Sequence, residues 1–224
     1  MAKSDVIYVC QECGSSQTQW GGQCGSCGKW NSIVEEFTND STPKGLSKKQ
    51  GRKINFVELK GTEEPYPRMF SKIAEFDRVC GGGLVPGSAI LVGGDPGIGK
   101  STILLQVCVA LSFAKDARCV YISGEESIDQ VRMRAKRLGL SDANVELASA
   151  TSVRDIITSL NENNSPTVVV IDSIQTLYVD NLDSAPGTVT QVRTSAQELI
   201  SLAKRRGFAL FLVGHVTKEG NIAG

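Results

Sequence analysis

Four continuous apolar runs of strand length follow one another along the chain after about residue 88. They are Ala89–Val92, Cys119–Ile122, Thr167–Ile171 and Ala209–Val213, with Val145–Ala148 as a shorter fifth candidate. Each run is apolar at successive positions rather than at alternate ones, which is typical of strands buried on both faces of a parallel sheet. These segments therefore predict a central sheet made mainly of parallel strands.

Helical patterns occupy the segments between these runs, at Ser101–Phe113, Ser127–Leu138, Ser152–Asn161 and Val189–Arg206. The last segment has apolar residues three and four positions apart, which is the spacing of one helix face. It ends in Lys204-Arg205-Arg206 followed by Gly207, and cations in the last turn with glycine after it are typical of a helix C-terminus. Alternating strands and helices predict a doubly wound α/β fold with right-handed crossovers.

The first 66 residues follow neither pattern. Residues 1–36 are rich in Cys, Gly and Trp and predict a compact small module, whereas residues 37–66 are polar with several Pro and Gly residues and predict a linker. Between Phe37 and Lys53 this linker has five basic residues and one acidic residue. Two interpretations remain, a solvated linker or a flexible arm that contacts phosphates. The third expected segment is an α/β core over residues 67–224.

Composition narrows the class of protein. Hydrophobic residues make up 41% of the 224 residues and charged residues 21%, which is typical of a soluble protein with one α/β domain and a small appendage. The formal net charge is zero, so the overall balance gives no indication of nucleic-acid binding. Met1–Val9 lacks the pattern of a secretory signal, and no apolar run is long enough to span a bilayer. We therefore expect a cytoplasmic protein with no membrane partner.

A phosphate-binding loop is the most specific motif in the chain. The segment Gly94-Asp95-Pro96-Gly97-Ile98-Gly99-Lys100-Ser101-Thr102 contains G-x-x-x-x-G-K-[ST] between an expected strand and an expected helix. Glycines let successive backbone N–H groups point at phosphate oxygens, and the helix N-terminus adds partial positive charge. Lys100 would contact the β- and γ-phosphates and Ser101 would bind Mg²⁺. The motif therefore predicts ATP and Mg²⁺ as cofactors.

Acidic residues end two of the expected strands. Asp172 closes Val168–Ile171, where it would hold Mg²⁺ through water, although a strand-end aspartate can also cap a turn. Glu125 and Glu126 follow Cys119–Gly124, at the same sheet edge as the phosphate loop. Either glutamate could orient the attacking water, and we favour Glu125. The alternative is that both acids begin the next helix, where they suit its dipole.

Four of the seven cysteines form two C-x₂-C pairs, Cys10 with Cys13 and Cys24 with Cys27. Four thiolates suit tetrahedral Zn²⁺ and leave no open position for catalysis, so the module is expected to be a zinc ribbon stabilised by its metal. A redox role for the pairs is the weaker alternative.

The remaining cysteines and the two tryptophans have simpler interpretations. Cys80, Cys108 and Cys119 lie in apolar contexts and are expected to be buried thiols. Trp20 and Trp30 are expected to pack inside the small module, with stacking on a nucleic-acid base as the alternative.

A resemblance to a known family becomes specific when the motifs are taken together. The four-cysteine module precedes Ile73–Arg78, Gly81–Ser88, Gly93–Thr102, Tyr121–Ser127 and Val168–Leu177. This combination closely resembles the RadA (Sms) family of bacterial DNA repair proteins, which are RecA-like ATPases, and the resemblance covers essentially the whole chain. It implies a RecA-like P-loop core after a zinc ribbon. The chain ends before the Lys-Asn-Arg-Phe-Gly motif and the Lon-protease-like domain of that family, so we expect the core to be incomplete at its C-terminus.

The resemblance also implies a function and further site residues. Members of the family process branched recombination intermediates as hexameric, ATP-driven helicase or branch-migration enzymes on single-stranded DNA, together with a recombinase of the RecA type. By motif position, Glu125 takes the catalytic glutamate role, with Lys100 and Asp172 completing the ATPase site. His215, in Gly214–Lys218, takes the position of a γ-phosphate sensor that leads into a DNA loop, and Tyr178–Thr188 takes the position of the other DNA loop. Lys218 is a candidate phosphate or DNA contact.

Two rival functions are open at this point. A nucleotide-regulated scaffold of the circadian-clock ATPase type shares the Gly81–Gly87 style of segment before the core, although the zinc ribbon argues against it. Alternatively, the ribbon is the working part that binds a partner, and the ATPase only assembles it. ATPase stimulation by single-stranded DNA distinguishes the first rival, and Cys27→Ser with Lys100 intact distinguishes the second.

Overall fold

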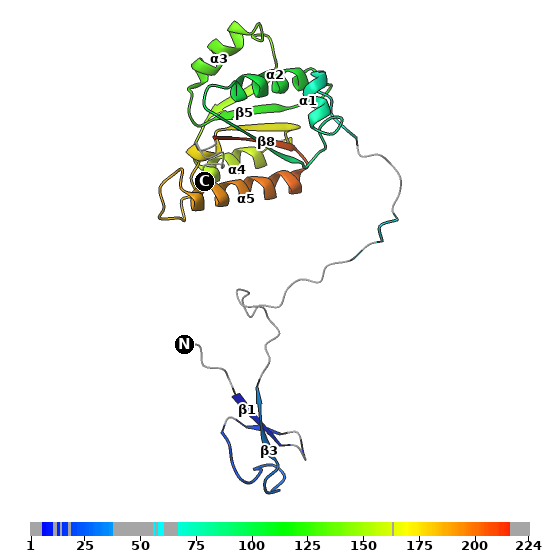
Figure 1. The fold of residues 1–224 in the computed structure, drawn as a ribbon, viewed down its shortest axis with the longest axis vertical. Coiled ribbons are helices and arrows are strands. Elements are labelled where there is room, and N and C mark those ends of the chain that lie inside the picture. Colours follow the sequence, from blue (N-terminus) through cyan, green and yellow to red (C-terminus); the bar gives the residue numbers. More distant parts are fainter. Residues whose placement is uncertain are drawn as a thin grey trace. The chain divides into compact units, whose positions relative to one another are not determined.

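The computed structural model describes residues 6–10, 13, 15–17, 19–37, 56, 58–60, 67–162 and 164–215. The chain forms two compact units, Met1–Thr62 and Glu63–Gly224, which are drawn in Figure 1 and described separately here. Most of the expected linker lies outside the described residues. The segment after His215, with Lys218, lies outside them as well.

The larger unit is built on a five-stranded sheet. Its strands are β4 (Ala89–Gly94), β5 (Cys119–Ser123), β6 (Val145–Ser149), β7 (Val168–Asp172) and β8 (Ala209–His215). They lie in the order β4-β8-β7-β5-β6, and every neighbouring pair is parallel. The predicted fold class, an α/β core with a parallel central sheet after a four-cysteine module, is confirmed.

Helices cover both faces of this sheet, as Figure 1 shows, with α1, α2 and α3 on one side and α4 and α5 on the other. Their bounds are α1 (Ala74–Val79), α2 (Lys100–Ser112), α3 (Ile128–Arg137), α4 (Val153–Asn161) and α5 (Val189–Arg206), with a 3₁₀ turn η1 (Ile174–Thr176) after β7. Among the described residues, no helix has both the length and the apolar character that crossing a membrane requires.

The two helical layers explain why the strands are apolar at successive positions. In β7, Val169 and Ile171 pack in the core on the α4 and α5 side, whereas Val168 and Val170 pack in the core on the α2 side. Adjacent side chains of a strand point to opposite faces, so a strand covered on both sides buries every residue. All five residues of β7 are buried, and so are all five of β5.

Local signals at the helix ends match the structure. Ser127 begins α3 with a capping box, in which its side chain accepts from the backbone N–H of Gln130 while the Gln130 side chain accepts from the N–H of Ser127. Gly207 ends α5 in the left-handed region at φ 78°, after three basic residues. Helix α1 and the turn η1 were not predicted, because they span only six and three residues and carry no measurable periodicity.

The smaller unit contains the antiparallel strands β1 (Val6–Cys10), β2 (Ser16–Gln17) and β3 (Ile33–Phe37), in the order β2-β1-β3. Its described core is Cys10, Cys24 and Ile33, with Tyr8 packed against it. The expectation that the tryptophans pack inside this module is wrong, because Trp20 is 65% exposed and Trp30 is 70% exposed. A core built around four cysteines has too little interior to enclose two indole rings.

Candidate functional site

The phosphate loop connects β4 to α2 in the expected place. Gly94 is the last residue of the strand and Lys100 is the first residue of the helix. Gly97 and Gly99 adopt positive φ angles of 81° and 104°, which side chains with a Cβ rarely allow. The loop can therefore wrap closely around an anion only with glycine at these two positions. Asp95, Pro96 and Ile98 are exposed along it.

Lys100 is held against this loop. Its Nζ donates to the carbonyl oxygens of Gly94 at 2.7 Å and Asp95 at 2.8 Å, and the residue is only 7% exposed. The ammonium group therefore lies at the loop and not in open solvent, next to the N-terminal end of α2. Ser101 and Thr102 follow in the first turn of α2 and are half-buried.

The parallel strands bring the other candidate residues to the same edge. In the register of the sheet, Gly94 of β4 is opposite His215 of β8, and Ser123 of β5 is opposite Asp172 of β7. Strand β8 lies between β4 and β7, so His215 stands between the phosphate loop and Asp172.

Glu125 is held by two partners at this edge. The Ser173 hydroxyl donates to its Oε1 at 2.5 Å, and His215 Nε2 lies 3.0 Å from the same oxygen. Burial, the largest single influence, raises the pKa of Glu125, but the hydrogen bonds from Ser173 and His215 and the charges of His215 and Lys100 together lower it. Glu125 is therefore a carboxylate at neutral pH, which is the form that can orient or deprotonate water.

Glu126 points to different partners. Its Oε2 accepts a hydrogen bond from Arg134 Nη2 of α3 at 2.5 Å, while its backbone N–H donates to Ser123 Oγ at 2.8 Å. The side chains of the two adjacent glutamates thus have different partners, Ser173 and His215 for Glu125 and Arg134 for Glu126. Only Glu125 contacts His215, which neighbours the phosphate loop.

Asp172 is buried at the end of β7, where the Tyr121 hydroxyl donates to its Oδ2. Burial and the Asp172 charge raise the pKa of Tyr121, so the phenol keeps its proton. No hydrogen bond joins Asp172 to Ser101 among the described residues. None is needed, because Ser101 would bind the ion directly and Asp172 would reach it through a water molecule. Hydroxyl and carboxylate oxygens are ligands that fit Mg²⁺.

Three residues of this site were missed from the sequence: Ser173, Tyr121 and Arg134. Ser173 directly follows Asp172, and this position at the end of a strand was the one feature of the sequence that could have indicated a role for Ser173 in the site. Tyr121 and Arg134 contact Asp172 and Glu126 only through the fold, and nothing in the local pattern separates them from ordinary core and surface residues.

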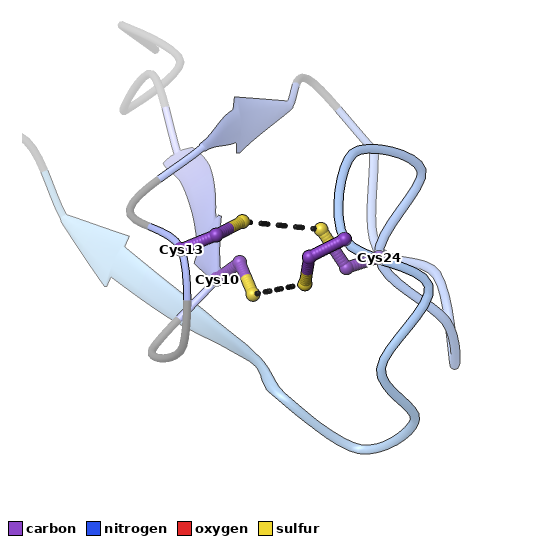
Figure 2. A group of neighbouring side chains, drawn as sticks. Cys10, Cys13 and Cys24 are labelled. Atoms are coloured by element: carbon purple, nitrogen blue, oxygen red, sulfur yellow. Dashed lines mark hydrogen bonds between the residues drawn. The ribbon is translucent and has the colours of Figure 1, made fainter.

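The four cysteines of the smaller unit form a separate candidate metal centre. Their sulfur atoms all lie within 4.8 Å of one another, with 3.7 Å between Cys10 and Cys27 and 3.7 Å between Cys13 and Cys24. Figure 2 shows the thiols of Cys10, Cys13 and Cys24 directed into one space. A tetrahedral zinc with Zn–S bonds of about 2.3 Å places its sulfur atoms about 3.8 Å apart, whereas a disulfide needs about 2.05 Å. The arrangement therefore fits zinc.

Serine hydroxyls surround this centre. Ser15 Oγ lies 3.3 Å from the sulfur atoms of both Cys13 and Cys24, and Ser32 Oγ lies 3.3 Å from that of Cys10. The hydrogen bond from Ser15, with help from the backbone N–H groups of Cys27 and Ser26, lowers the pKa of the Cys24 thiol to about 5. The pKa of Cys27 is raised instead, because the backbone hydrogen bond from Lys29 does not offset the neighbouring thiols and burial. A thiolate is the form that binds a metal. Elsewhere, Cys108 and Cys119 are buried as expected, whereas Cys80 is half-buried.

Comparison with known proteins places this fold in a family. Residues 67–221, more than half of the chain, match the family model described as AAA domain. The chain belongs to the AAA domain family. In this AAA-domain protein, residues 8–35 also match the model described as a rubredoxin metal binding domain.

Several curated relatives of this AAA-domain protein are bacterial DNA repair proteins. It is 54% identical to DNA repair protein RadA of Brucella abortus, 49% identical to that of Rickettsia felis and 44% identical to that of Bacillus subtilis. Each match covers 100% of this chain and 49–50% of the relative. The resemblance to RadA is therefore confirmed, and the chain spans about half the length of these relatives.

Proposed function

We propose that this chain is the ATP-hydrolysing part of a DNA repair protein of the RadA type. The observation that carries the proposal is the convergence of Lys100, Glu125 and His215 at one sheet edge. In that arrangement Glu125 is an ionised carboxylate with its orientation set by His215 and Ser173. A phosphate loop alone would support nucleotide binding, but an oriented carboxylate beside it supports hydrolysis.

The residues of the site divide the chemistry among them. Backbone N–H groups of the loop 94–99 and the ammonium of Lys100 bind the phosphates of ATP. Ser101 would hold Mg²⁺ directly and Asp172 through water, and when bound the ion would supply positive charge to the phosphate oxygens. Glu125 orients the attacking water and accepts its proton. His215, opposite Gly94 in the sheet, would sense the γ-phosphate and transmit its presence to Glu125, and its position in the sheet supports this role.

The relatives' name supports a role on DNA, and the position of Tyr178–Thr188 supports a link between DNA and nucleotide. This loop begins two residues after η1, which directly follows Asp172 and Ser173. It contains Asp180 and Asp183 and no basic residue, so contacts with DNA would come from its backbone and polar groups. We propose single-stranded and branched DNA as the substrate, a RecA-type recombinase as a partner and a homo-hexamer as the complete assembly.

ATP hydrolysis with and without single-stranded DNA tests the proposal. The wild-type chain is expected to hydrolyse ATP faster with DNA, and Lys100→Ala is expected to lose hydrolysis in both conditions. Lys115→Ala is the matched control, because Lys115 is an exposed lysine beyond the end of α2. Equal rates of ATP hydrolysis in the wild type and Lys100→Ala would overturn the enzyme assignment. A wild-type rate that is the same with and without DNA would favour a nucleotide-regulated scaffold.

The exposed tryptophans favour a second function, for the smaller unit. An indole ring on a small ribbon can stack a base of single-stranded nucleic acid, and Trp20 and Trp30 are both open to solvent. They are the only two tryptophans of the chain, so tryptophan fluorescence reports on this unit alone. Quenching on addition of a single-stranded oligonucleotide, reduced in Trp30→Ala, is the expected result. Unchanged fluorescence at saturating DNA would remove this role.

A further inference from the structure

A buried tyrosine on β5 contacts the aspartate that closes β7. Tyr121 is fully buried, and its hydroxyl donates to Oδ2 of Asp172. The two residues are 51 positions apart and meet only because β5 and β7 are neighbours in the sheet. Otherwise Tyr121 packs in the apolar core that faces α2 and α3.

The tyrosine is itself held from α3. Nη2 of the buried Arg134 lies 3.4 Å from the Tyr121 hydroxyl, and the guanidinium carbon lies 5.9 Å from the centre of the phenol ring. The same Nη2 is 2.5 Å from Glu126, whose neighbour is Glu125. A continuous chain of contacts therefore runs from Asp172 through Tyr121 and Arg134 to the turn that carries Glu125.

Core packing alone does not explain a tyrosine at this position. A phenylalanine would fill the same apolar space, whereas a buried hydroxyl is costly unless it is hydrogen-bonded. Here the hydroxyl is bonded to the buried carboxylate of Asp172. Groups that hold a metal-binding carboxylate in one orientation commonly change metal affinity when they are removed.

We propose that Tyr121, held by Arg134, is a positioning residue that sets the orientation of the Asp172 carboxylate toward Mg²⁺. This inference rests on the proposed function, in which Asp172 holds the Mg²⁺ ion of a bound nucleotide through water. In this role Tyr121 acts only through its hydrogen bond to Asp172. Arg134 acts one step further away, through the tyrosine hydroxyl.

The test is the Mg²⁺ dependence of nucleotide binding in Tyr121→Phe. Binding of a fluorescent mant-ADP is followed while MgCl₂ is titrated, and again in EDTA without Mg²⁺. We expect the half-saturating Mg²⁺ concentration to rise about tenfold in the variant. Affinity in EDTA should stay within about twofold of wild type, because the phosphate loop is unchanged. Tyr8→Phe, which removes a hydroxyl from the smaller unit, is the matched control and should leave both values unchanged.

Arg134→Gln provides a second, independent variant. It should shift the Mg²⁺ dependence in the same direction by a smaller factor, and the double variant should match Tyr121→Phe alone. Thermal unfolding shows whether each variant is folded, and if Tyr121→Phe is not, Arg134→Gln decides the question. An unchanged Mg²⁺ dependence, or an equal loss of affinity in EDTA, would overturn the positioning role. A wild-type chain that binds mant-ADP without any dependence on Mg²⁺ would instead overturn the proposed function, and this inference with it.

Discussion

His215 Nε2, at the end of β8, lies 3.0 Å from Oε1 of Glu125, which follows β5. The two residues are 90 positions apart in the chain. Because β8 is also the neighbour of β4, His215 is opposite Gly94, the first residue of the phosphate loop. His215 thus stands beside the first residue of the loop that would bind phosphate, while its side chain contacts the carboxylate that would orient water.

Replacing His215 by alanine should slow hydrolysis and spare nucleotide binding. Without the imidazole, Glu125 keeps only the Ser173 hydroxyl as a side-chain partner among the described residues, so its orientation is less defined. We expect kcat to fall about tenfold or more, because a misplaced catalytic group loses rate steeply. Affinity for a non-hydrolysable ATP analogue should change less than about threefold. Single-turnover hydrolysis and equilibrium binding measure the two quantities.

The partner variant Glu125→Gln provides the control for this interpretation. It should lose at least about 100-fold in kcat, since it removes the carboxylate that we propose as the proton acceptor. If His215 acts through Glu125, the double variant should be no slower than Glu125→Gln. A further, independent loss in the double variant would show that His215 contacts the nucleotide in another way.

The lowered pKa of Glu125 has a consequence for acid stability. The folded state favours the carboxylate, so its contribution to the free energy of unfolding is present above the ordinary pKa of 4.5 and is lost as pH falls through the lower folded value. The side chain is 42% exposed, so solvent screening limits the contribution to less than about 1 kcal/mol. Urea midpoints from pH 3 to 7 should show Glu125→Gln below wild type at neutral pH, with the gap closing below pH 4.5.

The exposed Glu198→Gln is the control for the loss of one negative charge. It should follow the wild type at every pH. A gap between Glu125→Gln and the wild type that widens as the pH falls below 4.5 would contradict the assigned partners of Glu125.

Local patterns predicted some features well because their causes are local. The double burial of β5 and β7 is visible as unbroken apolar runs, the phosphate loop needs glycine at fixed positions, and each C-x₂-C pair lies within four residues. The contacts of Glu125 with His215 and of Tyr121 with Asp172 depend on the strand order, which no local pattern contains. The tryptophans were misplaced for another reason, because in so small a unit apolar character does not guarantee an interior to enter.

Gly124 should not tolerate even a methyl group. A Cβ built on it would lie 2.0 Å from Thr176 Oγ1 and 3.0 Å from Thr176 Cβ, so the turn after β5 and the turn η1 would have to separate. Gly124→Ala should therefore displace Glu125 and lower kcat about 100-fold, since a shift of about 1 Å has such a cost. Adding Thr176→Ala removes the closest atom and should restore part of the rate.

The steric origin of that effect can be checked directly. Gly25→Ala is a suitable control, because a Cβ at Gly25 meets no atom within 4 Å, and it should leave kcat unchanged. A double variant Gly124→Ala with Thr176→Ala that is as slow as Gly124→Ala alone would rule out the clash as the cause.

Gln191 should determine the order of the loop 178–188. Its buried amide accepts from the N–H of Val179 at 2.8 Å and donates to the carbonyls of Ser184 at 2.8 Å, Val179 at 3.3 Å and Leu182 at 3.4 Å. Gln191→Leu would leave these groups without the amide, at a cost of about 1–3 kcal/mol. Hydrogen exchange in residues 179–184 should accelerate, and stimulation of ATPase by DNA should fall. The exposed Gln197→Leu on the same helix should do neither, and protection equal to wild type in Gln191→Leu would contradict this role.

Removing zinc should unfold the smaller unit and leave the larger one intact. The described core of the smaller unit is little more than two cysteines and one isoleucine, so the metal bonds are expected to supply most of its folding free energy. Metal analysis should find one zinc per chain in the wild type and none in Cys27→Ser, whereas Cys80→Ser, which lies outside the cluster, should keep its zinc.

Two spectroscopic signals separate the two units. Tryptophan fluorescence follows the smaller unit alone. Far-ultraviolet circular dichroism follows the helices, and every helix among the described residues lies in the larger unit. Chelation should therefore shift the emission without moving the helical melting transition, because the two units are separately compact. Emission that is the same with and without zinc would show that the ribbon is held together by something other than its four thiolates.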